Sequence, residues 1–333
     1  MTQYSRLTFA ERKQIYQLNK SGKGVRYIAR YLGRSPSTIS EELQKKCNTT
    51  SMYNPCWAHQ WAGKLKERNR RKAKIQGPLE GIILAHLLDC HCSPEQISGR
   101  LKRLFPKWDY LHVSPETIYR YVYRSSIRKH LIASLRRKHK RRGQKKTGMK
   151  RGGIKNCVSI HERPVHVFNR EEFGHWEGDL IIGKGQKSAM GTLVERSSRF
   201  LMLISLKSRD SETVTEAFIE AFSTLPPHLR KSLTYDRGSE MAEHFRITTK
   251  AGMDIYFADA GQPQQRGTNE NTNGLIREYF PKGIDLSQFT EEDVMQVQEY
   301  INQRPKKVLD YATPKEAMHW SKERPGAKLS CFQ

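Results

Sequence analysis

The sequence predicts a mixed α/β domain preceded by all-α helical units, and three observations support this fold class. Basic residues are concentrated in the first part of the chain, and the same part contains short helices with a repeated capping pattern. From about residue 166 apolar strands appear, with a helix between two of them. With 333 residues, the chain is long enough for two or three domains and at least one sizeable core.

The net charge of +25 arises from residues 1–150. They hold 34 Lys and Arg against 9 Asp and Glu, whereas residues 151–333 hold 25 of each class. Such a basic region attracts a polyanion, and nucleic acid is the commonest one. A membrane surface is the alternative, but the basic part shows neither an amphipathic anchor nor a lipidation signal. We therefore expect double-stranded DNA as the partner.

Signals for other compartments and for disulfides are weak. The sequence shows no apolar leader and no run of 18 apolar residues, so we expect a cytoplasmic, nucleoid-associated protein without membrane contact. The six cysteines are too sparse for a disulfide framework. Four potential zinc ligands between His86 and Cys92 have a spacing unlike the usual zinc frameworks, so we interpret these cysteines as free thiols.

A Ser-Pro pattern recurs three times in the basic half, as "SPSTI" (35–39), "SPEQI" (93–97) and "SPETI" (114–118). Serine is a favoured N-cap, and proline is tolerated at the first helical position. Each copy therefore predicts the start of a helix.

The first copy belongs to a predicted helix-turn-helix domain over residues 1–50. Helical periodicity predicts one helix to about residue 19, a second over 25–32 and a third from 35, with a turn at Gly33. The third helix would enter the major groove of DNA; a small solvated helical bundle is the alternative. The expected DNA-binding residues are Arg34, Ser37, Thr38, Ser40, Gln44 and Lys45.

The other two copies fall in a second helical domain, expected over residues 51–130. This domain is either a second helix-turn-helix or a helical spacer. Residues 131–165 follow as a linker, because their basic run is interleaved with glycine. We expect this linker to track the phosphate backbone of DNA.

Residues 166–325 have the pattern of a mixed α/β sheet. Strands are predicted within 175–183, 191–208, 231–238 and 253–259, and a helix is predicted over 211–226. The first strands form a hairpin meander, and later strands alternate with helices.

Three acids in this region have positions that suggest chemistry. Asp179 lies in the first strand, Asp236 follows the strand at 231–235, and Glu270 lies near the start of a predicted helix. Singly, each has an ordinary structural explanation as an edge residue, a turn former or a helix-start acid. Together they match the needs of phosphodiester chemistry, in which a metal pair about 3.5–4 Å apart activates the attacking oxygen and stabilises the leaving one. Carboxylates without nearby His or Cys favour Mg²⁺ over zinc.

Several motifs resemble one known family over essentially the whole chain. The segments are "YIARYLGRSPSTIS", "GHWEGDLIIG", "LVERSSRF", "TYDRGSEMAEH", "QRGTNENTNGLIREYFPKG" and "NQRPKKVLDYATPKEA". They are similar to bacterial insertion-sequence transposases of the IS-thirty family. The 33 residues between Asp236 and Glu270 match the acid spacing of that family.

This resemblance implies a ribonuclease-H-like catalytic domain of the DDE type, with Asp179, Asp236 and Glu270 as the metal-binding catalytic triad. It implies a transposase that binds the terminal inverted repeats of its element, cleaves a strand and joins it to another phosphodiester. Mg²⁺ would be the cofactor, with Mn²⁺ as a substitute, and a homo-oligomer would form the synaptic complex. Further DNA contacts would come from the polar face of the helix that carries Glu270, namely Asn269, Asn273 and Arg277.

Two other functions compete with this interpretation. A non-enzymatic helix-turn-helix regulator would use the α/β domain for dimerisation, and its acids would be incidental. A ribonuclease-H-like nuclease would cut DNA without end specificity and without strand joining.

Overall fold

The structure, a computed structural model, describes residues 5–47, 50–68, 73–135, 157–324, 326 and 329. The chain divides into two compact units, Met1–Ala73 and Lys74–Gln333. Residues 136–156 of the predicted basic linker lie outside the described residues. Among the helices that are described, none combines the length and the apolar character needed to cross a membrane.

The first unit contains the predicted helix-turn-helix, formed by α2 (Val25–Leu32) and α3 (Pro36–Leu43). The turn between them includes Gly33, whose φ of 62° is left-handed and therefore suits glycine. Ser35 accepts a hydrogen bond from the backbone N–H of Thr38, which confirms the predicted N-cap. The unit is completed by α1 (Phe9–Lys20), β1 (Lys46–Cys47), β2 (Thr50–Tyr53) and α4 (Pro55–Arg68).

A buried ion pair fixes α3 against α1. Arg12 donates from Nε to Glu42 Oε1 at 2.7 Å, and both side chains are almost fully buried. Glu42 also accepts hydrogen bonds from Tyr53 and Lys45. Because breaking such a buried pair is costly, this network holds α3 against α1.

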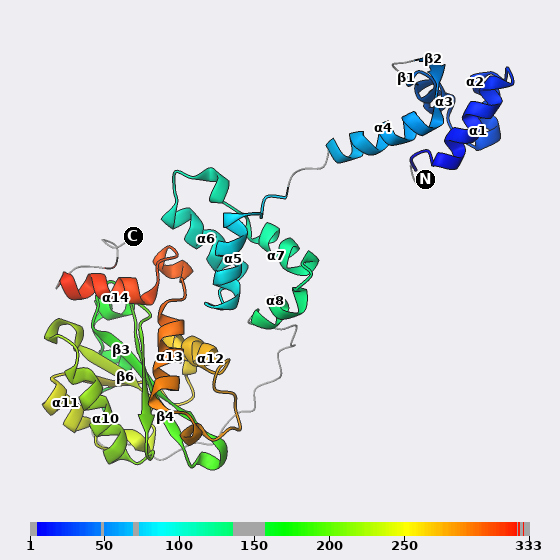
Figure 1. Ribbon diagram of the computed structural model, residues 1–333. Helices are drawn as coiled ribbons and strands as arrows, with labels where there is room; N and C mark the ends of the chain where they lie inside the picture. Colours follow the sequence, from blue (N-terminus) through cyan, green and yellow to red (C-terminus); the bar gives the residue numbers. More distant parts are fainter. Residues whose placement is uncertain are drawn as a thin grey trace. The chain divides into compact units, whose positions relative to one another are not determined.

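The second unit begins with four helices around a core of their own (Figure 1). They are α5 (Pro78–Leu88), α6 (Pro94–Leu104), α7 (Pro115–Arg124) and α8 (Arg128–Ser134). Ser93 and Ser114 cap α6 and α7, which confirms the remaining two predicted helix starts. Helix α6 contacts the C-terminal part of the chain, since Arg100 pairs with Glu316 and Gln96 donates to the carbonyl of Pro305 at 2.7 Å.

We expect Ser93→Ala to lower the free energy of unfolding of this unit by about 1 kcal/mol, because the substitution leaves a backbone N–H of α6 without its cap. Ser93→Asn should leave stability nearly unchanged, since asparagine caps as well as serine. Urea unfolding of the three proteins measures the difference. Equal loss in both variants would contradict a capping role.

The rest of the second unit is built on a five-stranded mixed sheet in the order β5-β4-β3-β6-β7. The strands are β3 (His175–Ile182), β4 (Ala189–Glu195), β5 (Leu201–Leu206), β6 (Ser232–Tyr235) and β7 (Asp254–Phe257). The first three pair antiparallel, and β3-β6 and β6-β7 pair parallel. All predicted strands are confirmed, and the strand order is that of the expected ribonuclease-H-like fold.

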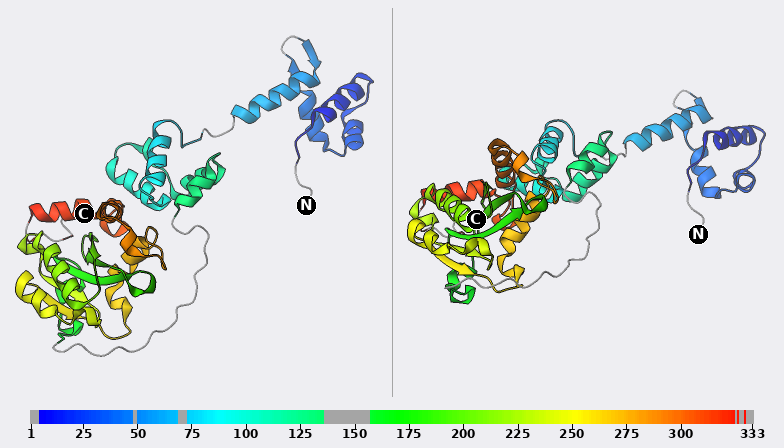
Figure 2. Two further views of the ribbon diagram at one scale, coloured as in Figure 1. Left: turned by 60° about the horizontal axis from the view of Figure 1, so that its bottom comes forward. Right: turned by 90° about the horizontal axis from the view of Figure 1, so that it is seen from below.

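Helices cover both faces of this sheet, as both views in Figure 2 show. On one face, α10 (Ser211–Ser223) and α11 (His244–Ala251) enclose a core that includes Trp176, Phe218 and Leu233. On the other, α12 (Gly267–Ile276) and α13 (Glu291–Asn302) pack over Ile181 and Val194. Because residues of a strand alternate between faces, Glu177, Asp179 and Ile181 all point toward the α12 face. Helix α14 (Pro314–Glu323) follows near the C-terminus.

Candidate active site

Strand register brings Asp179 and Asp236 side by side. In the parallel pair of β3 and β6, Glu177 lies opposite Thr234. Asp179 and Asp236 each follow two residues later, so both point to the same face at the same level of the sheet. Asp236 lies immediately after β6, and its side chain is partly exposed to solvent.

Arg266 links the two aspartates. Its Nη2 lies 3.1 Å from Asp236 Oδ2, and its Nη1 lies 3.6 Å from Asp179 Oδ1. The same guanidinium donates to the carbonyl of Gly178 at 2.8 Å. Burial raises the pKa of Asp179, Arg266 lowers it, and the charge of Asp236 raises it again, so that the pKa is raised overall. Two carboxylates with one guanidinium between them leave one negative charge that a bound cation would balance.

A buried glutamate fixes the start of α12. Glu177 is fully buried, and its Oε2 accepts hydrogen bonds from the backbone N–H groups of Thr268 and Asn269, each at 3.0 Å. Arg196 lies 3.5 Å from the other carboxylate oxygen. A carboxylate at a helix N-terminus also interacts favourably with the helix dipole. Sequence reasoning missed Glu177, although its position two residues before Asp179 placed it on the same face of the strand.

Asn269 was expected to contact DNA, but in this structure its side chain lies in the interior. Its side chain is fully buried and donates to the carbonyls of Glu177 and Thr192 at 2.9 and 3.2 Å. Thr192 in turn donates from its hydroxyl to Asn269 Oδ1. Asn269 therefore fastens α12 to β3 and β4.

Asn273 lies against the first aspartate. Its Nδ2 donates to Asp179 Oδ2 at 2.9 Å, and its Oδ1 is buried without a hydrogen-bond partner among the described residues. Glu270 is exposed and lies three residues earlier on α12. Residues three apart on a helix are neighbours, so Glu270 and Asn273 share the helix side that borders Asp179.

Arg277 extends from the end of the same helix to the sheet. Its Nη2 donates to the carbonyl of Ile182 at 3.0 Å, and its side chain is partly buried. Asn273 and Arg277, both expected to contact DNA, are therefore engaged with β3 in this structure. Arg266, whose guanidinium lies between the two aspartates, was not singled out by sequence reasoning.

The residues present fit a hard divalent cation. The donor set consists of carboxylate oxygens, with the unpartnered Oδ1 of Asn273 beside Asp179 as a further oxygen. Mg²⁺ prefers carboxylate and amide oxygens and keeps several waters. Asp236 and Glu270 provide the solvent-facing part of this set, so water has access to it.

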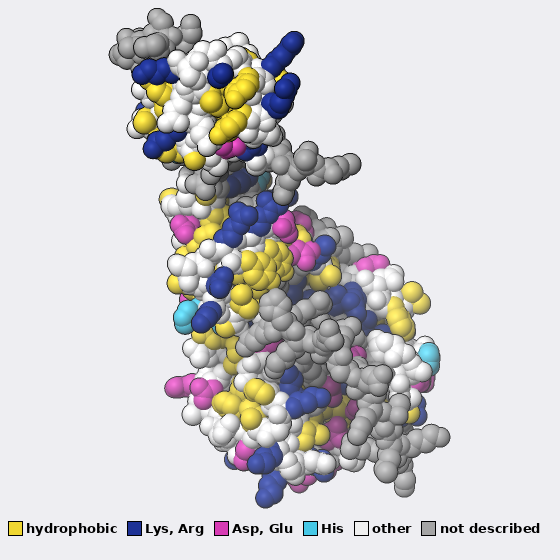
Figure 3. All heavy atoms as spheres, turned by 90° about the vertical axis from the view of Figure 1, so that its right-hand side faces the viewer, with side chains coloured by type: hydrophobic (Ala, Val, Ile, Leu, Met, Phe, Trp, Pro, Cys, Tyr) yellow, Lys and Arg dark blue, Asp and Glu magenta, His cyan; other side chains and the backbone are white. Residues whose placement is uncertain are grey.

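Only some of the residues predicted to read DNA at α3 are exposed to solvent. Ser37 and Gln44 are exposed, and Thr38 and Ser40 are half-buried. Figure 3 shows Lys and Arg side chains spread over the surface of the first unit, in the upper part of the view.

Two of the residues predicted to contact DNA have partners within the first unit in this structure. Arg34 donates from Nε to Glu11 at 2.8 Å and from Nη1 to the carbonyl of Ser5 at 2.8 Å. Lys45 pairs with Glu42 at 2.6 Å. These contacts stabilise the unit, and the sequence pattern gave no sign of them because the partners are distant in the chain or belong to the buried network.

Comparison with family models places both parts of the chain in known classes. A helix-turn-helix domain matches residues 3–46, and an integrase core domain matches residues 169–263. The catalytic core domain of BIV integrase is similar at 15% identity and a TM-score of 0.37, covering 48% of this chain and 99% of that one. The two family models define a protein with a helix-turn-helix DNA-binding domain and an integrase-type core.

Full-length relatives give the family. The transposase InsI of insertion sequence element IS30A from Escherichia coli (strain K12) is 42% identical over 318 residues, covering 93% of this chain and 82% of the relative. The transposase of IS1086 from Cupriavidus metallidurans is 40% identical, covering 95% of each chain. The transposase of IS4351 from Bacteroides fragilis is 35% identical, covering 87% and 88%. The chain belongs to the IS30 family of insertion-sequence transposases.

Proposed function

We propose that Asp179, Asp236 and Glu270 form the catalytic, metal-binding triad of a DDE transposase. One observation carries this proposal: Asp179 and Asp236 are adjacent in register, and α12 presents Glu270 one turn before Asn273, which contacts Asp179. The regulator hypothesis has to treat the adjacent register of the two aspartates and the place of Glu270 on α12 as incidental.

The chain's own residues position the reaction. Asp179 and Asp236, with Glu270, would hold Mg²⁺, or Mn²⁺ in its place. Bound metal lowers the pKa of the attacking water or hydroxyl and stabilises charge on the leaving oxygen. Asn273 orients Asp179 by its hydrogen bond, while Asn269 and Glu177 keep α12 at a fixed height above β3. Arg266 keeps the two aspartates together and balances part of their charge.

The proposed role of each segment follows from its charge. Residues 1–50 would recognise the terminal inverted repeats of the element, while the basic residues of 131–165 would follow the phosphate backbone. Residues 51–130 would link these to the catalytic domain at 166–325. Two element ends have to be joined in one reaction, so we infer a homo-oligomer in the synaptic complex, acting on DNA of the nucleoid.

Labelled end DNA incubated with the full chain and Mg²⁺ tests the proposed activity. We expect cleavage at the element end and products in which the labelled end is joined to a second duplex. Cleavage without joining and without end preference would favour the nuclease alternative. Specific binding without any metal-dependent product would favour the regulator.

A substitution at the C-cap of α3 tests DNA reading. We expect Gln44→Ala to reduce discrimination between end DNA and random DNA by about 1–3 kcal/mol, because an exposed amide on this helix is suited to a bidentate base contact. Gln14→Ala, on the exposed side of α1, is the matched control and should leave discrimination unchanged. Competition binding at fixed salt measures both. If Gln44→Ala weakens binding to both DNAs equally, Gln44 contacts phosphate rather than a base.

A further inference from the structure

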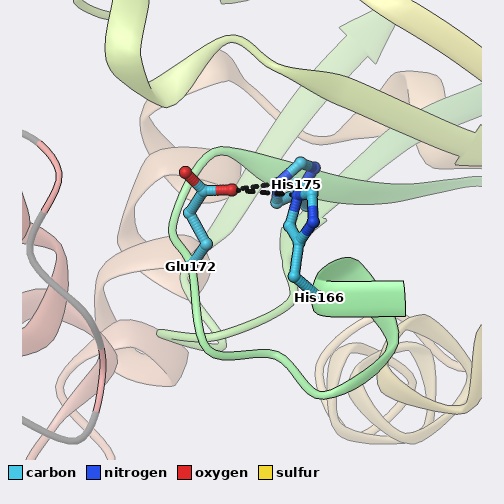
Figure 4. A group of neighbouring side chains, drawn as sticks. All are labelled: His166, Glu172 and His175. Carbon is cyan, nitrogen blue, oxygen red and sulfur yellow. Dashed lines mark hydrogen bonds and ion pairs between the residues drawn. The ribbon is translucent and has the colours of Figure 1, made fainter. Parts of the chain in front are cut away.

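Three metal-ligating side chains converge at the entrance to β3, away from the carboxylates of the triad. They are His166 from the short helix α9 (Val165–Phe168), Glu172 from the following loop and His175 from the first residue of β3 (Figure 4). One ligand atom from each lies within 4.8 Å of the others. No other group of this kind occurs among the residues that the structure describes.

The two imidazoles approach the same carboxylate oxygen. Nε2 of His175 lies 3.1 Å from Glu172 Oε2, and Nε2 of His166 lies 3.3 Å from it. Around a tetrahedral zinc ion, ligand atoms at about 2.0–2.2 Å from the metal are about 3.4 Å apart. The two separations from Glu172 Oε2 are close to that value, and the two imidazoles offer ligand atoms within 4.8 Å of each other.

Neighbouring residues hold two of the donors in orientation. Nδ1 of His175 forms a 2.8 Å hydrogen bond with the hydroxyl of Ser232, at the start of β6. If Nδ1 carries the proton and donates to Ser232, the lone pair of Nε2 faces Glu172. Lys231 donates to Oε1 of Glu172, which leaves Oε2 directed at the imidazoles. Such outer partners typically fix the tautomer of a metal-bound histidine and the orientation of a metal-bound carboxylate.

We propose that His166, Glu172 and His175 form a binding site for Zn²⁺, with a fourth position open to solvent. Two imidazoles and one carboxylate are a known zinc ligand set. The site would tie α9 and its loop to the first residue of β3, and through Ser232 to β6. It would thereby stabilise the two strands that lead to Asp179 and Asp236, four residues beyond each anchor.

The chain offers a matched control in a second histidine–carboxylate pair without a third donor. His161 Nε2 lies 2.7 Å from Asp259 Oδ2, and its side chain, like that of His166, is more than half exposed. His166→Ala therefore removes a proposed ligand, while His161→Ala removes a comparable surface pair. Since His166 is more than half exposed, neither substitution empties the core.

Zinc titration of the chelator-treated full chain by calorimetry tests the site. The titration is made in the Asp179→Asn background, so that zinc binding at the triad is weakened. We expect one tight equivalent of Zn²⁺ that raises the thermal unfolding midpoint. His166→Ala and Glu172→Gln should each weaken it by at least about 10–100-fold, whereas His161→Ala should bind as the parent does.

Cobalt substitution identifies the ligand type. Co²⁺ at the proposed site should give the visible bands of tetrahedral or five-coordinate cobalt without a thiolate charge-transfer band. A thiolate charge-transfer band, if it appeared, would assign the metal to Cys90 and Cys92 and overturn the proposal. Unchanged zinc affinity in His166→Ala, or no tight zinc at all, would also overturn it and would leave the cluster as a pair of histidine–carboxylate hydrogen bonds.

Discussion

Asp179→Asn, Asp236→Asn and Glu270→Gln are each expected to reduce strand cleavage and joining by on the order of 10³-fold or more. Each amide keeps the size of the side chain but removes the charge that a divalent cation needs. DNA-end binding should persist, because the helix-turn-helix belongs to the other compact unit. Combining two of the substitutions should reduce cleavage and joining little further. The three carboxylates act as one unit, and the loss of one metal ligand already disables it.

Two other glutamates provide controls for this experiment. Glu292 is exposed in the first turn of α13, and Glu292→Gln should leave joining unchanged. Glu278 lies just beyond α12 and pairs with Arg304 at 3.3 Å. If Glu278→Gln abolishes joining while Glu270→Gln does not, the third carboxylate has been assigned to the wrong residue. Gel assays with labelled end DNA and Mg²⁺ give both readouts.

Glu177→Gln is expected to lower the free energy of unfolding of the second unit by about 3–5 kcal/mol, because it leaves the guanidinium of Arg196 buried without its carboxylate. The substitution also removes the negative charge at the N-terminus of α12. Joining activity should fall as well, since α12 carries Glu270. Hydrogen exchange over residues 267–276 and chemical unfolding measure the two effects.

A double-substitution cycle separates the ion pair from a simple loss of packing. Replacing Arg196 by Met together with Glu177→Gln removes both charges, so the double variant should be more stable than Glu177→Gln alone. Glu292→Gln is the surface control and should change stability by less than about 0.5 kcal/mol. Strictly additive effects of the two buried substitutions would show that Glu177 and Arg196 do not interact.

Much of the fold was predictable because its signals are local. The three Ser-Pro helix starts depend on a cap and its own first turn, and all three are confirmed. The strands of the sheet show a regular side-chain pattern, and the helix at 211–223 shows helical periodicity. The acids Asp179, Asp236 and Glu270 were chosen from their positions in these elements and from family motifs. Their assignment as a triad stays a prediction.

Contacts between distant segments were not predictable in the same way. The backbone of a strand shows which face a residue takes, but not what packs on that face. An asparagine in "GTNENTNG" is compatible with DNA contact or with a buried hydrogen-bond network. Only the placement of α12 over β3 and β4 decides that Asn269 is buried and that Asn273 contacts Asp179.

The sequence by itself determined the class of the protein: its charge distribution, its capped helices and its acids at strand and helix ends indicated a DNA-binding chain with a mixed-sheet core. The tertiary structure decided which polar residues form ion pairs and hydrogen bonds within the protein. Arg34 and Lys45 pair with Glu11 and Glu42, and Glu177 binds the start of α12. The physical reason is that a charged or amide side chain has the same local sequence preferences whether it contacts DNA or forms contacts inside the protein. Its burial, and therefore the partner it must find, depends on segments brought together from far along the chain.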